Sequence, residues 1–374
     1  MEPIRVCSRC VMDITDPEIV FDERGICNHC RAYDANAARF AFSPEERQQR
    51  FDALVARMRQ EGKGKDYDCV IGLSGGVDSS YVAHLLVRHG VRPLAVHLDN
   101  GWNSELAVKN IENLVTKLGI DLITHVVDWE EFRDLQLAFL RASTPDSEIP
   151  SDHAIVALLC RTAVKHRIRF MVTGRNYQTE SHLPRRWSSG HLDWKYIREL
   201  NRRFGGRPLR TFPHVSVLQL SLWLATGRLE WVDLLNLVDY DKERAIREME
   251  ETLGWKYYGG KHYESIYTRF YQGYILPRKF GFDKRKTHLS SLICSGKMSR
   301  EEALEELKKP PYPEELQRED REYATKKFGL TEQKFEGILR NPPKDYRDYP
   351  HFDLLEQGWY RWGRTLYRRL RSDR

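Results

Sequence analysis

A short glycine-rich run, flanked by an apolar segment and a helical pattern, constrains this chain more than any other feature. The run reads Leu73-Ser74-Gly75-Gly76-Val77-Asp78-Ser79-Ser80, after the apolar segment 68–73 and before an expected helix at 79–89. Paired glycines let backbone N–H groups approach an anion closely, and the positive end of the following helix favours negative charge. We therefore expect a cradle for pyrophosphate, with Asp78 holding an accompanying Mg²⁺ ion. A glycine turn without a ligand is the alternative, and a Walker A loop is excluded because its GxxxxGKS or GxxxxGKT pattern is missing.

Apolar runs of strand length alternate with helical patterns around this loop. Expected strands span 69–73, 93–98, 122–127 and 170–173, and expected helices span 79–89, 105–118 and 155–166. This alternation is typical of an α/β fold with a doubly wound parallel sheet, in which ligands bind beyond the carboxyl ends of the strands. A further helix is expected between Ser43-Pro44 and Gly62, because apolar residues recur there at helical spacing.

The run at 74–80 resembles the motif of the PP-loop ATP pyrophosphatases, which have an adenine nucleotide alpha hydrolase-like fold. Enzymes of this superfamily split ATP into AMP and pyrophosphate. The resemblance implies that His97, Leu98 and Asp99, at the end of the second strand, contact adenosine mainly through backbone groups. Ordinary turn chemistry is the alternative for this loop.

A second loop carries part of the same resemblance. Thr173-Gly174-Arg175-Asn176 follows a later strand and is similar to the TGHN-type segment of the superfamily, with Arg175 in place of the usual histidine. The resemblance implies that Gly174 and Asn176 contact the nucleotide. The replaced histidine leaves the role of position 175 open, and turn chemistry is again the alternative.

Four of the seven cysteines form one pattern near the start of the chain. Cys7-x2-Cys10 and Cys27-x2-Cys30 have the spacing of two zinc knuckles that bring four thiolates to one tetrahedral Zn²⁺ ion. Such a closed site leaves no position for catalysis, and it would stabilise a segment without its own core by about 10 kcal/mol or more. Iron in place of zinc, or two disulfides in a secreted module, are the alternatives. Three other cysteines are expected to be isolated and buried, namely Cys69, Cys160 and Cys294.

The composition fits an intracellular enzyme of two or three domains. The chain has 374 residues, 60 Lys and Arg against 54 Asp and Glu, and a formal net charge of +6. This small excess does not imply nucleic acid, since phosphate-rich ligands would suffice. The first residues lead into the cysteine pattern without an apolar h-region, and no long apolar stretch follows. We therefore expect a cytoplasmic location and no transmembrane segment.

Changes in residue pattern divide the chain into five expected units. They are a zinc-knuckle module at 1–33, a helix and linker at 34–66, an ATP pyrophosphatase domain at 67–215, a helical substrate-binding region at 216–310 and a C-terminal helical tail at 311–374. Aromatic side chains between Trp359 and Leu370 indicate a terminal helix that either packs on the body or docks a partner.

Motifs along nearly the whole chain resemble the N-acetyl sugar amidotransferase family. They include the cysteine segments at 7–13 and 27–30, Ile149-Pro150-Ser151-Asp152-His153-Ala154, the segment 259–265 and Lys279-Phe280-Gly281-Phe282-Asp283-Lys284-Arg285. Enzymes of this family act in making lipopolysaccharide O-antigen, other surface polysaccharide or flagellin sugars. They convert an N-acetyl group on a nucleotide sugar into an acetamidino group.

This chemistry explains a need for ATP. Amide resonance, which makes peptide rotation cost about 18–20 kcal/mol, leaves an acetamido carbon a poor electrophile and its oxygen a poor leaving group. Adenylation of the amide oxygen corrects both, with pyrophosphate leaving on the cradle and ammonia displacing AMP. Catalysis would rest mostly on positioning and charge neutralisation by Ser74, Asp78 and Mg²⁺.

The chain shows no ammonia source of its own. A glutaminase with an amino-terminal nucleophile would need cysteine at position 2, which is Glu2, and no Cys/His triad signature is visible. The resemblance implies a separate glutaminase, of the imidazole glycerol phosphate synthase type, with a cyclase-like companion carrying ammonia. Ammonia must be shielded from water and protonation, so we expect a docked channel.

The family motifs also imply a sugar site and further catalytic residues. Beside Ser74 and Asp78, the candidates for catalysis are Asp152, His153, His262 and Glu264. The candidates for substrate binding are Asn176, Glu180, Lys261, His262, Glu264, Arg269, Lys284, Arg285 and His288. A core helix with a polar edge is the alternative for the segment 254–274, and we favour it for the aromatic side chains there. For 284–288 the alternative is a solvated helix end.

Two basic regions keep another function open. Residues 185–210 carry eight Lys or Arg against two acids, with aromatic side chains between them, and residues 361–374 carry six Arg. Such patches can be nucleic-acid footprints, so a PP-loop tRNA thiolase is the alternative function. Those enzymes place paired cysteines in the ATP domain, whereas Ala157 and Ala163 flank Cys160 at the pairing positions. A zinc-bearing scaffold without ATP turnover is a third hypothesis, which the intact motif at 74–80 disfavours.

Overall fold

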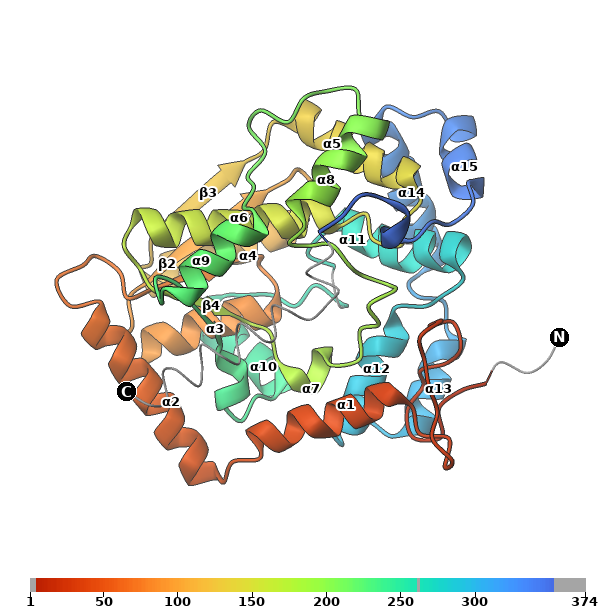
Figure 1. Cartoon of the computed structure of the whole chain (residues 1–374). Coiled ribbons are helices and arrows are strands. Elements are labelled where there is room, and N and C mark those ends of the chain that lie inside the picture. The colour runs from red at the N-terminus through yellow and green to blue at the C-terminus, as the bar shows by residue number, and fades with distance from the viewer. Residues whose placement is uncertain (1–4, 261–262, 353–374) are drawn as a thin grey trace.

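A five-stranded parallel sheet lies at the centre of the structure, a computed structural model that describes residues 5–260 and 263–352 (Figure 1). The strand order is β3-β2-β1-β4-β5. The strands are β1 (Cys69–Gly72), β2 (Pro93–Asp99), β3 (Leu122–Val126), β4 (Phe170–Thr173) and β5 (Glu230–Asp233). Ile71 of β1 aligns with Ala95 of β2 and Val172 of β4. The predicted parallel α/β sheet is confirmed.

The sheet grows outward from β1 in two directions. β2 and β3 follow on one side, and the chain then returns to place β4 and β5 on the other. In open α/β sheets, ligands bind in the crevice beyond the carboxyl ends of the strands at such a reversal. The reversal here lies between β1 and β4, so the loops that follow Gly72 and Thr173 lie at this crevice.

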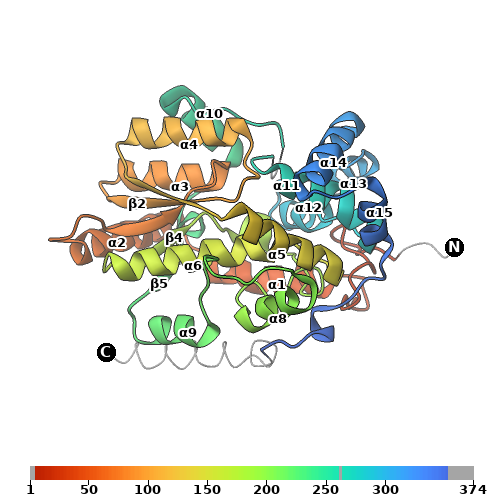
Figure 2. The ribbon, with the colours of Figure 1, turned by 90° about the horizontal axis from the view of Figure 1, so that it is seen from above.

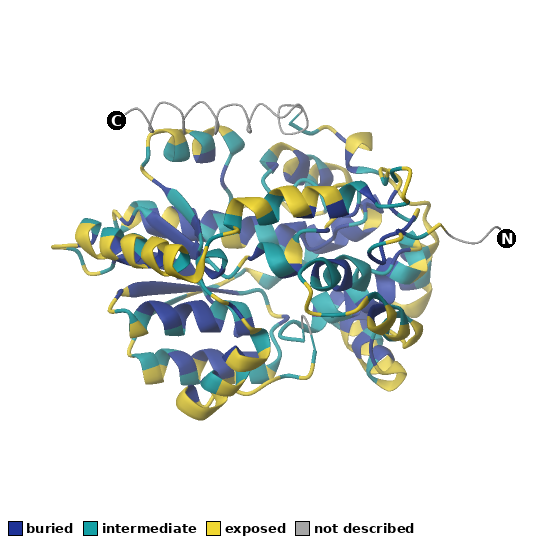
Figure 3. Cartoon of the chain, turned by 90° about the horizontal axis from the view of Figure 1, so that it is seen from below, coloured by how far each residue is buried: buried dark blue, intermediate teal, exposed yellow. Residues whose placement is uncertain are grey.

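Helices cover both faces of the sheet, as a doubly wound fold requires (Figure 2). α3 (Val77–Arg88), α4 (Glu105–Leu118) and α10 (Lys242–Leu253) pack together over one face, and α6 (Ile149–Lys165) covers the other. Buried residues concentrate in the strands and on the helix sides turned toward them (Figure 3). α6 begins earlier than the predicted residue 155, because Pro150 suits the first turn of a helix, where no intrahelical N–H bond is needed.

The presence of strand β5 differs from the domain organisation that the sequence predicts. The sequence pattern assigns 216–310 to a helical region, yet Glu230–Asp233 pairs with β4 at the edge of the sheet. A strand of four residues is too short for an alternating pattern to stand out after the apolar helix α9 (Val217–Ala225). The sheet thus extends beyond the boundary predicted at residue 215.

The amino-terminal, connecting and carboxyl-terminal parts are mainly helical. Their helices are α1 (Asn28–Ala37), α2 (Pro44–Glu61), α5 (Trp129–Ala142), α7 (Tyr177–Glu180), α8 (Trp194–Phe204), α11 (Ile266–Phe270), α12 (Arg285–Cys294), α13 (Arg300–Lys308), α14 (Glu314–Phe328) and α15 (Glu332–Arg340). α11 continues into a π-helical segment, Tyr271–Phe280. Within the described ranges, no helix combines the length and apolarity needed to cross a membrane. The expected terminal helix between Trp359 and Leu370 lies outside these ranges.

Local sequence explains where α2 begins and which side it buries. Ser43 and Glu46 form a capping box that satisfies free backbone groups at the start of the helix. Phe51, Val55 and Met58 then face the core.

Aromatic side chains also fill the core around α11, where Tyr267, Phe270, Tyr271 and Tyr274 are buried. The preferred interpretation of the aromatics in 254–274 as core residues is confirmed for these four and for Trp255. It does not hold for Tyr257, which is 40% exposed and lines the cavity described below together with Tyr263.

Candidate active site

The loops after β1 and β4 meet where no side chain could fit. Gly75 has φ +77°, and a Cβ there would lie 2.5 Å from the carbonyl oxygen of Ala107 in α4. At Gly174, after β4, a Cβ would lie 2.9 Å from the Cβ of Asp78. Glycine has no Cβ and permits both approaches. The two predicted ligand loops are therefore in contact at the reversal of the sheet.

Hydroxyl oxygens occupy the N–H side of the loop after β1. The N–H of Gly76 donates to Ser74 Oγ (3.2 Å), and the N–H of Ser74 donates to Ser79 Oγ (3.3 Å). The N–H of Val77, in the first turn of α3, donates to the hydroxyl oxygen of Tyr258 (3.2 Å). Phosphate oxygens are stronger acceptors than neutral hydroxyls, so this set of donors fits a pyrophosphate group. The cradle stays a prediction, and the geometry suits it.

Asp78 lies half-buried in the first turn of α3 and accepts a hydrogen bond from the hydroxyl of Tyr240. With Ser74 and Ser79 it offers oxygen ligands, the kind that Mg²⁺ prefers. Ser80 is fully buried, whereas Asp78 and Ser79 are half-buried, and all three are absent from the wall of the cavity described below. Consecutive helical residues point about 100° apart, so Ser79 and Ser80 do not share a face. The predicted contact of Ser80 with the nucleotide therefore lacks support.

His97 holds the same loop from the neighbouring strand. Its Nδ1 lies 2.8 Å from the carbonyl oxygen of Leu73, and its Nε2 lies 3.1 Å from Nδ2 of Asn103. Burial lowers the pKa of His97, which favours the neutral ring. In that state Nδ1 donates to the carbonyl and Nε2 accepts from the amide of Asn103. His97 thus positions the loop that it was predicted to accompany.

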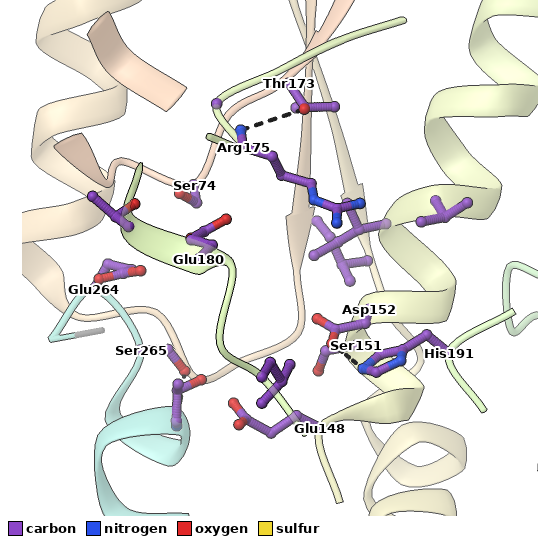
Figure 4. A pocket seen from close by; sticks show the side chains of 18 of the residues that line it. Ser74, Glu148, Ser151, Asp152, Thr173, Arg175, Glu180, His191, Glu264 and Ser265 are labelled. Carbon is purple, nitrogen blue, oxygen red and sulfur yellow. Dashed lines mark hydrogen bonds and ion pairs between the residues drawn. The ribbon is translucent and has the colours of Figure 1, made fainter. Parts of the chain in front are cut away.

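A large cavity of about 2010 Å³ runs from the loop after β1 to the carboxyl-terminal helices (Figure 4). It brings together twelve of the predicted site residues, namely Leu73, Ser74, His97, Leu98, Asp152, Gly174, Glu180, Glu264, Arg269, Lys284, Arg285 and His288. In Figure 4, Arg175 extends from the loop after β4 into this space, opposite Glu180 and Ser74. Lys261 and His262 lie outside the described residues.

Asp99 and Asn176 hold turns rather than line the cavity. Oδ1 of Asp99 accepts from the N–H of Gly101 (2.9 Å), and Oδ1 of Asn176 accepts from the N–H of Thr179 (3.0 Å) at the start of α7. Both residues are absent from the cavity wall. The alternative of turn chemistry therefore accounts for the oxygens of these two side chains.

His153 packs inside the protein. Its Nδ1 lies 2.7 Å from the carbonyl oxygen of His191, its Nε2 accepts from the N–H of Val215 (3.3 Å), and its ring stacks on Trp194. Burial lowers the pKa of His153 to about 4. Both ring nitrogens are engaged with backbone, and the residue does not line the cavity, which argues against the catalytic role predicted for it. Asp152, its neighbour on α6, does line the cavity.

The cations predicted to bind substrate have acidic partners. Arg269 binds Asp320 through two bonds of 2.7 and 2.8 Å, and Nη2 of Arg285 lies 2.7 Å from Oδ2 of Asp283. Nζ of Lys284 lies 3.8 Å from Oε2 of Glu148. These pairs hold the cationic side chains in fixed positions on the cavity wall. Arg285 also donates to the backbone carbonyl oxygens of residues 306, 309 and 310, so the protein engages all five of its guanidinium N–H groups.

His191 is a cavity residue that the sequence motifs did not reveal. Its Nε2 lies 3.3 Å from a carboxylate oxygen of Asp146 and 3.3 Å from one of Asp152. Figure 4 shows His191 beside Asp152. Burial acts to lower the pKa of His191, but the two carboxylates outweigh it and raise the pKa to about 10. A charged imidazolium therefore faces the cavity at neutral pH. Sequence reasoning missed it because it stands in the basic region 185–210, outside the family motifs.

The four predicted metal-binding cysteines lie together in a fully buried cluster. The Sγ atoms of Cys7 and Cys30 are 3.9 Å apart, and those of Cys10 and Cys27 are 3.7 Å apart. Tetrahedral Zn²⁺ with bonds of about 2.3 Å separates its sulfur ligands by about 3.8 Å. Cys7 Sγ also accepts backbone N–H groups of residues 9, 10 and 27, which favour a thiolate. The cluster can hold a metal ion.

Cys294 was predicted to be isolated, like Cys69 and Cys160, but the structure places it beside the cysteine cluster. Its Sγ lies 3.7 Å from Sγ of Cys30 and 3.5 Å from Nε2 of His182. Cys69 and Cys160 are buried in the sheet domain, as expected. Sequence spacing could not place Cys294, because α12 and the cysteine module meet only in the folded chain.

Four of the eight cationic side chains in the basic region 185–210 pair with carboxylates. Arg202 and Arg203 both pair with Glu199, and Nη1 of Arg186 lies 2.7 Å from Oδ1 of Asp345. Trp187 is buried and stacks on Phe282 with ring centroids 4.1 Å apart. A nucleic-acid platform presents exposed aromatic faces between free cations. This arrangement does not favour the nucleic-acid hypothesis.

Comparisons with known families match two separate parts of the chain. Residues 49–174 match NAD synthase, and residues 264–365 match the family described as LPS biosynthesis protein WbpG-like, C-terminal domain. The first segment carries the loop after β1, and the second carries Glu264, Arg269, Lys284, Arg285 and His288. Both matched segments therefore contribute walls to the cavity.

Individual relatives span different parts of the chain. An uncharacterized protein of Methanocaldococcus jannaschii is 24% identical over 331 residues, which cover 86% of this chain and 99% of the relative. A tRNA(Ile)-lysidine synthase of Chlamydia pneumoniae is 37% identical over 70 residues, 18% of this chain and 22% of the relative.

Solved structures with similarity include enzymes on different substrates. NMN synthetase from Francisella tularensis is 22% identical with a TM-score of 0.28, over 37% of this chain and 56% of that chain. U34-tRNA thiolase NcsA from Methanococcus maripaludis is 13% identical with a TM-score of 0.33, over 79% of this chain and 87% of that chain.

Proposed function

Because this chain joins an NAD-synthase-type PP-loop domain to a WbpG-like C-terminal domain, it belongs to the WbpG-like N-acetyl sugar amidotransferase family of the PP-loop superfamily, and we propose its reaction. The enzyme converts an acetamido group of a nucleotide sugar into an acetamidino group, at the expense of ATP. The product serves the synthesis of a bacterial surface polysaccharide or flagellin glycan. Ammonia comes from a partner glutaminase.

One observation carries this proposal, namely that the same cavity is walled by both matched segments. Ser74 and His97 come from the PP-loop domain, and Glu264 and Arg285 come from the WbpG-like segment. A cavity for one drug-sized ligand is typically about 300–1,000 Å³. The volume of about 2010 Å³ leaves room for ATP and a nucleotide sugar side by side. A two-substrate transfer needs such a shared space.

The reaction balances without an oxidant or reductant. The acetamido oxygen attacks the α-phosphorus of ATP, forming an O–P bond as the bond to pyrophosphate breaks, and the amide nitrogen loses its proton. Ammonia then forms a bond to the activated carbon, and AMP leaves with the former amide oxygen. The former amide carbon then carries two nitrogens, its original one and the one from ammonia. This product group is an amidine, which is protonated at neutral pH.

The residues near the loop after β1 suit the first half of this reaction. Backbone N–H groups of 74–77 would hold the departing pyrophosphate, and Asp78 with Ser74 and Ser79 would hold Mg²⁺. Bound Mg²⁺ would neutralise charge on the phosphate oxygens. Arg175, which reaches into the cavity from the loop after β4, is placed to contact a phosphate or the second substrate.

The far wall of the cavity suits the nucleotide sugar. Lys284 and His288 lie at the start of α12, where they can meet a diphosphate, and Glu180 and Glu264 can accept hydrogen bonds from sugar hydroxyls. Arg285 supports this wall through its bonds to Asp283 and to backbone carbonyl oxygens. Asp152, held by His191, is a candidate base for the protons that ammonia loses. These assignments extend the predicted catalytic and substrate-binding sets.

A separate ammonia source is supported by the state of the described cysteines. Burial raises the pKa of Cys160 to about 12, and burial also raises the pKa of Cys69. Neither thiol is therefore suited to act as a glutaminase nucleophile, which needs an accessible thiolate. The clustered cysteines are committed to metal, which we assign as a structural Zn²⁺.

The test uses the full-length chain with ATP, Mg²⁺, ammonium chloride and a panel of acetamido nucleotide sugars. We expect AMP release that depends on one sugar, together with the mass loss caused by replacing a carbonyl oxygen with NH. Asp78→Asn should lower AMP release at least about 100-fold, as losses of single charge-stabilising groups do. Asp66→Asn, on the exposed surface before β1, is the matched control and should leave the rate unchanged.

Two other results would contradict the proposal. AMP release that depends on tRNA, with no mass change in any sugar, would replace this proposal by a tRNA-modifying function. ATP turnover absent with every sugar and every tRNA tested would instead favour the scaffold hypothesis.

A further inference from the structure

The ligand atoms around the cysteine module form two groups rather than one. The first group is Cys7, Cys10, Cys27 and Cys30, and a second group is Cys30, His182 and Cys294. Within each group, all ligand atoms lie within 4.8 Å of one another, and the groups share only Cys30. A thiolate sulfur has lone pairs enough to bind two ions at once, so Cys30 stands where a bridging ligand would.

Distances in the second group match those of a metal-binding site. Sγ of Cys294 lies 3.7 Å from Sγ of Cys30, near the separation of about 3.8 Å between two sulfur ligands of tetrahedral Zn²⁺. Nε2 of His182 lies 3.5 Å from Sγ of Cys294, and a Zn–N bond of about 2.0–2.1 Å predicts a separation of about 3.6 Å. Two of the three separations in this group therefore have the lengths expected of a tetrahedral site, and the third lies within 4.8 Å.

The hydrogen bonds of His182 present a lone pair to this site. The hydroxyl of Ser291 donates to the carbonyl oxygen of Thr287 (3.0 Å) and accepts from the N–H of Ser181 (3.2 Å). Its contact of 3.0 Å with Nδ1 of His182 is then one in which Nδ1 donates. This leaves Nε2 without a proton in the neutral ring, and a fully buried Nε2 points at Cys294. Metal-binding histidines are oriented in the same way by a partner of the other nitrogen.

Charge also favours a second ion at this place. One divalent ion on four thiolates leaves a net charge of about −2 in a buried cluster. A second divalent ion, bound with the Cys294 thiolate and a neutral histidine, leaves about −1. Uncompensated buried charge is costly, so the second ion lowers the electrostatic penalty of the cluster.

We propose that the module binds two zinc-class ions, with Cys30 bridging a closed four-cysteine site and a second site made by Cys30, His182 and Cys294. Cys294 is partly exposed, so a water molecule can serve as the fourth ligand of the second ion. The ligands of this site come from α1, from the residue two beyond α7 and from the end of α12. The proposal does not depend on the reaction proposed above.

A second ion would tie the metal module to the cavity wall. α7 contributes Thr179 and Glu180 to the cavity, and α12 contributes Arg285, Thr287 and His288. His182 and Cys294 belong to the same two stretches of chain. Metal at this site would therefore fix the relative positions of these cavity residues, whereas the four-cysteine site involves only residues 7–30.

The test counts metal in the full chain, purified in a reducing buffer with added ZnCl₂ and then desalted. Native mass spectrometry and elemental analysis should find two Zn²⁺ per wild-type chain. Cys294→Ser and His182→Asn should each retain one, and Asn can still donate to Ser291. Cys160→Ser, in a cysteine buried in the sheet domain, is the control and should retain two.

Cobalt replacement gives an independent measurement. Two Co²⁺ ions that share a thiolate couple magnetically, so the electron paramagnetic resonance signal per cobalt should be weaker in the wild type than in Cys294→Ser. One Zn²⁺ in the wild type, two in both variants, or iron with inorganic sulfide in place of zinc would each overturn the proposal. Circular dichroism identifies a variant that fails to fold, in which case the other variant decides.

Discussion

The cysteine module and the cavity both gather chemically active side chains, but they hold them in opposite ways. Ligand atoms of the module face one another, and four sulfurs within 4.8 Å of one another can hold one metal ion. Cationic side chains of the cavity are instead held by protein carboxylates, as Arg269 is held by Asp320. The module is thus arranged to hold a metal ion, whereas the cationic side chains of the cavity are positioned by carboxylates of the protein itself.

Removing a metal ligand should lower stability more than any other change considered below. A small loss of stability would contradict the comparison. Cys27→Ser deletes one of four ligands, and structural zinc contributes about 10 kcal/mol or more to folding of such modules. We expect loss of stoichiometric zinc and a large fall in thermal stability. Cys160→Ala, which touches no predicted metal ligand, should bind zinc as the wild type does. A Cys27→Ser chain with normal zinc and stability would contradict the metal-dependent module.

The ion pairs of the cavity provide the second test. Asp320→Ala leaves the Arg269 guanidinium buried without its partner, and breaking a buried pair costs about 3–5 kcal/mol. Glu305→Gln breaks an exposed pair with Lys308 and should cost less than about 1 kcal/mol. Urea unfolding of both variants measures the difference. Equal small losses would mean that the cavity does not depend on its internal pairs.

Two glycines with the same backbone conformation test how closely the nucleotide loop is packed. Gly75 and Gly64 both have φ +77°, but only Gly75 has backbone within reach, with Ala107 O at 2.5 Å from an added Cβ. Gly64→Ala should cost about 1–2 kcal/mol from the left-handed conformation alone. Gly75→Ala must also displace α4 or the loop, so we expect a larger loss of stability and a large drop in AMP release. Similar losses for both would show that the loop tolerates a side chain.

The smallest expected effect concerns pH and His191. Its pKa in the folded protein is raised to about 10 from 6.5, so its pairs with Asp146 and Asp152 stabilise the fold fully below about pH 6.5. That contribution is lost as pH rises toward 10. Because part of the ring is exposed, we expect a loss of about 1–2 kcal/mol between pH 7 and 9. His191→Gln should remove this slope in chemical unfolding, and an unchanged slope would contradict the assignment.

Particular residues show how far sequence reasoning reached. The paired CxxC spacing predicted a compact cluster, because each pair is local and a metal site needs only four thiolates. The loop after β1 followed from glycines next to a helix start, which is also local chemistry. The surroundings of His153 and Cys294 could not be predicted, because distant segments make them, Val215 for the first and residues 30 and 182 for the second.

The cavity illustrates the same division. Family motifs pointed to Glu264, Lys284 and Arg285, and the structure brings all three to one space. No pattern indicated that Tyr258 would accept the N–H of Val77, or that His191 would stand between two carboxylates. Such contacts depend on how loops far apart in the chain pack together.

The amino-acid sequence by itself determined the α/β alternation, the glycine loop and the four-cysteine pattern, because periodicity, backbone freedom and ligand spacing act over short stretches of chain. Only the tertiary structure decided that β5 extends the sheet, that His153 is buried, and that Cys294 and His182 join the metal module. Those outcomes are set by long-range packing and by the need to pair buried polar groups, which no local pattern encodes.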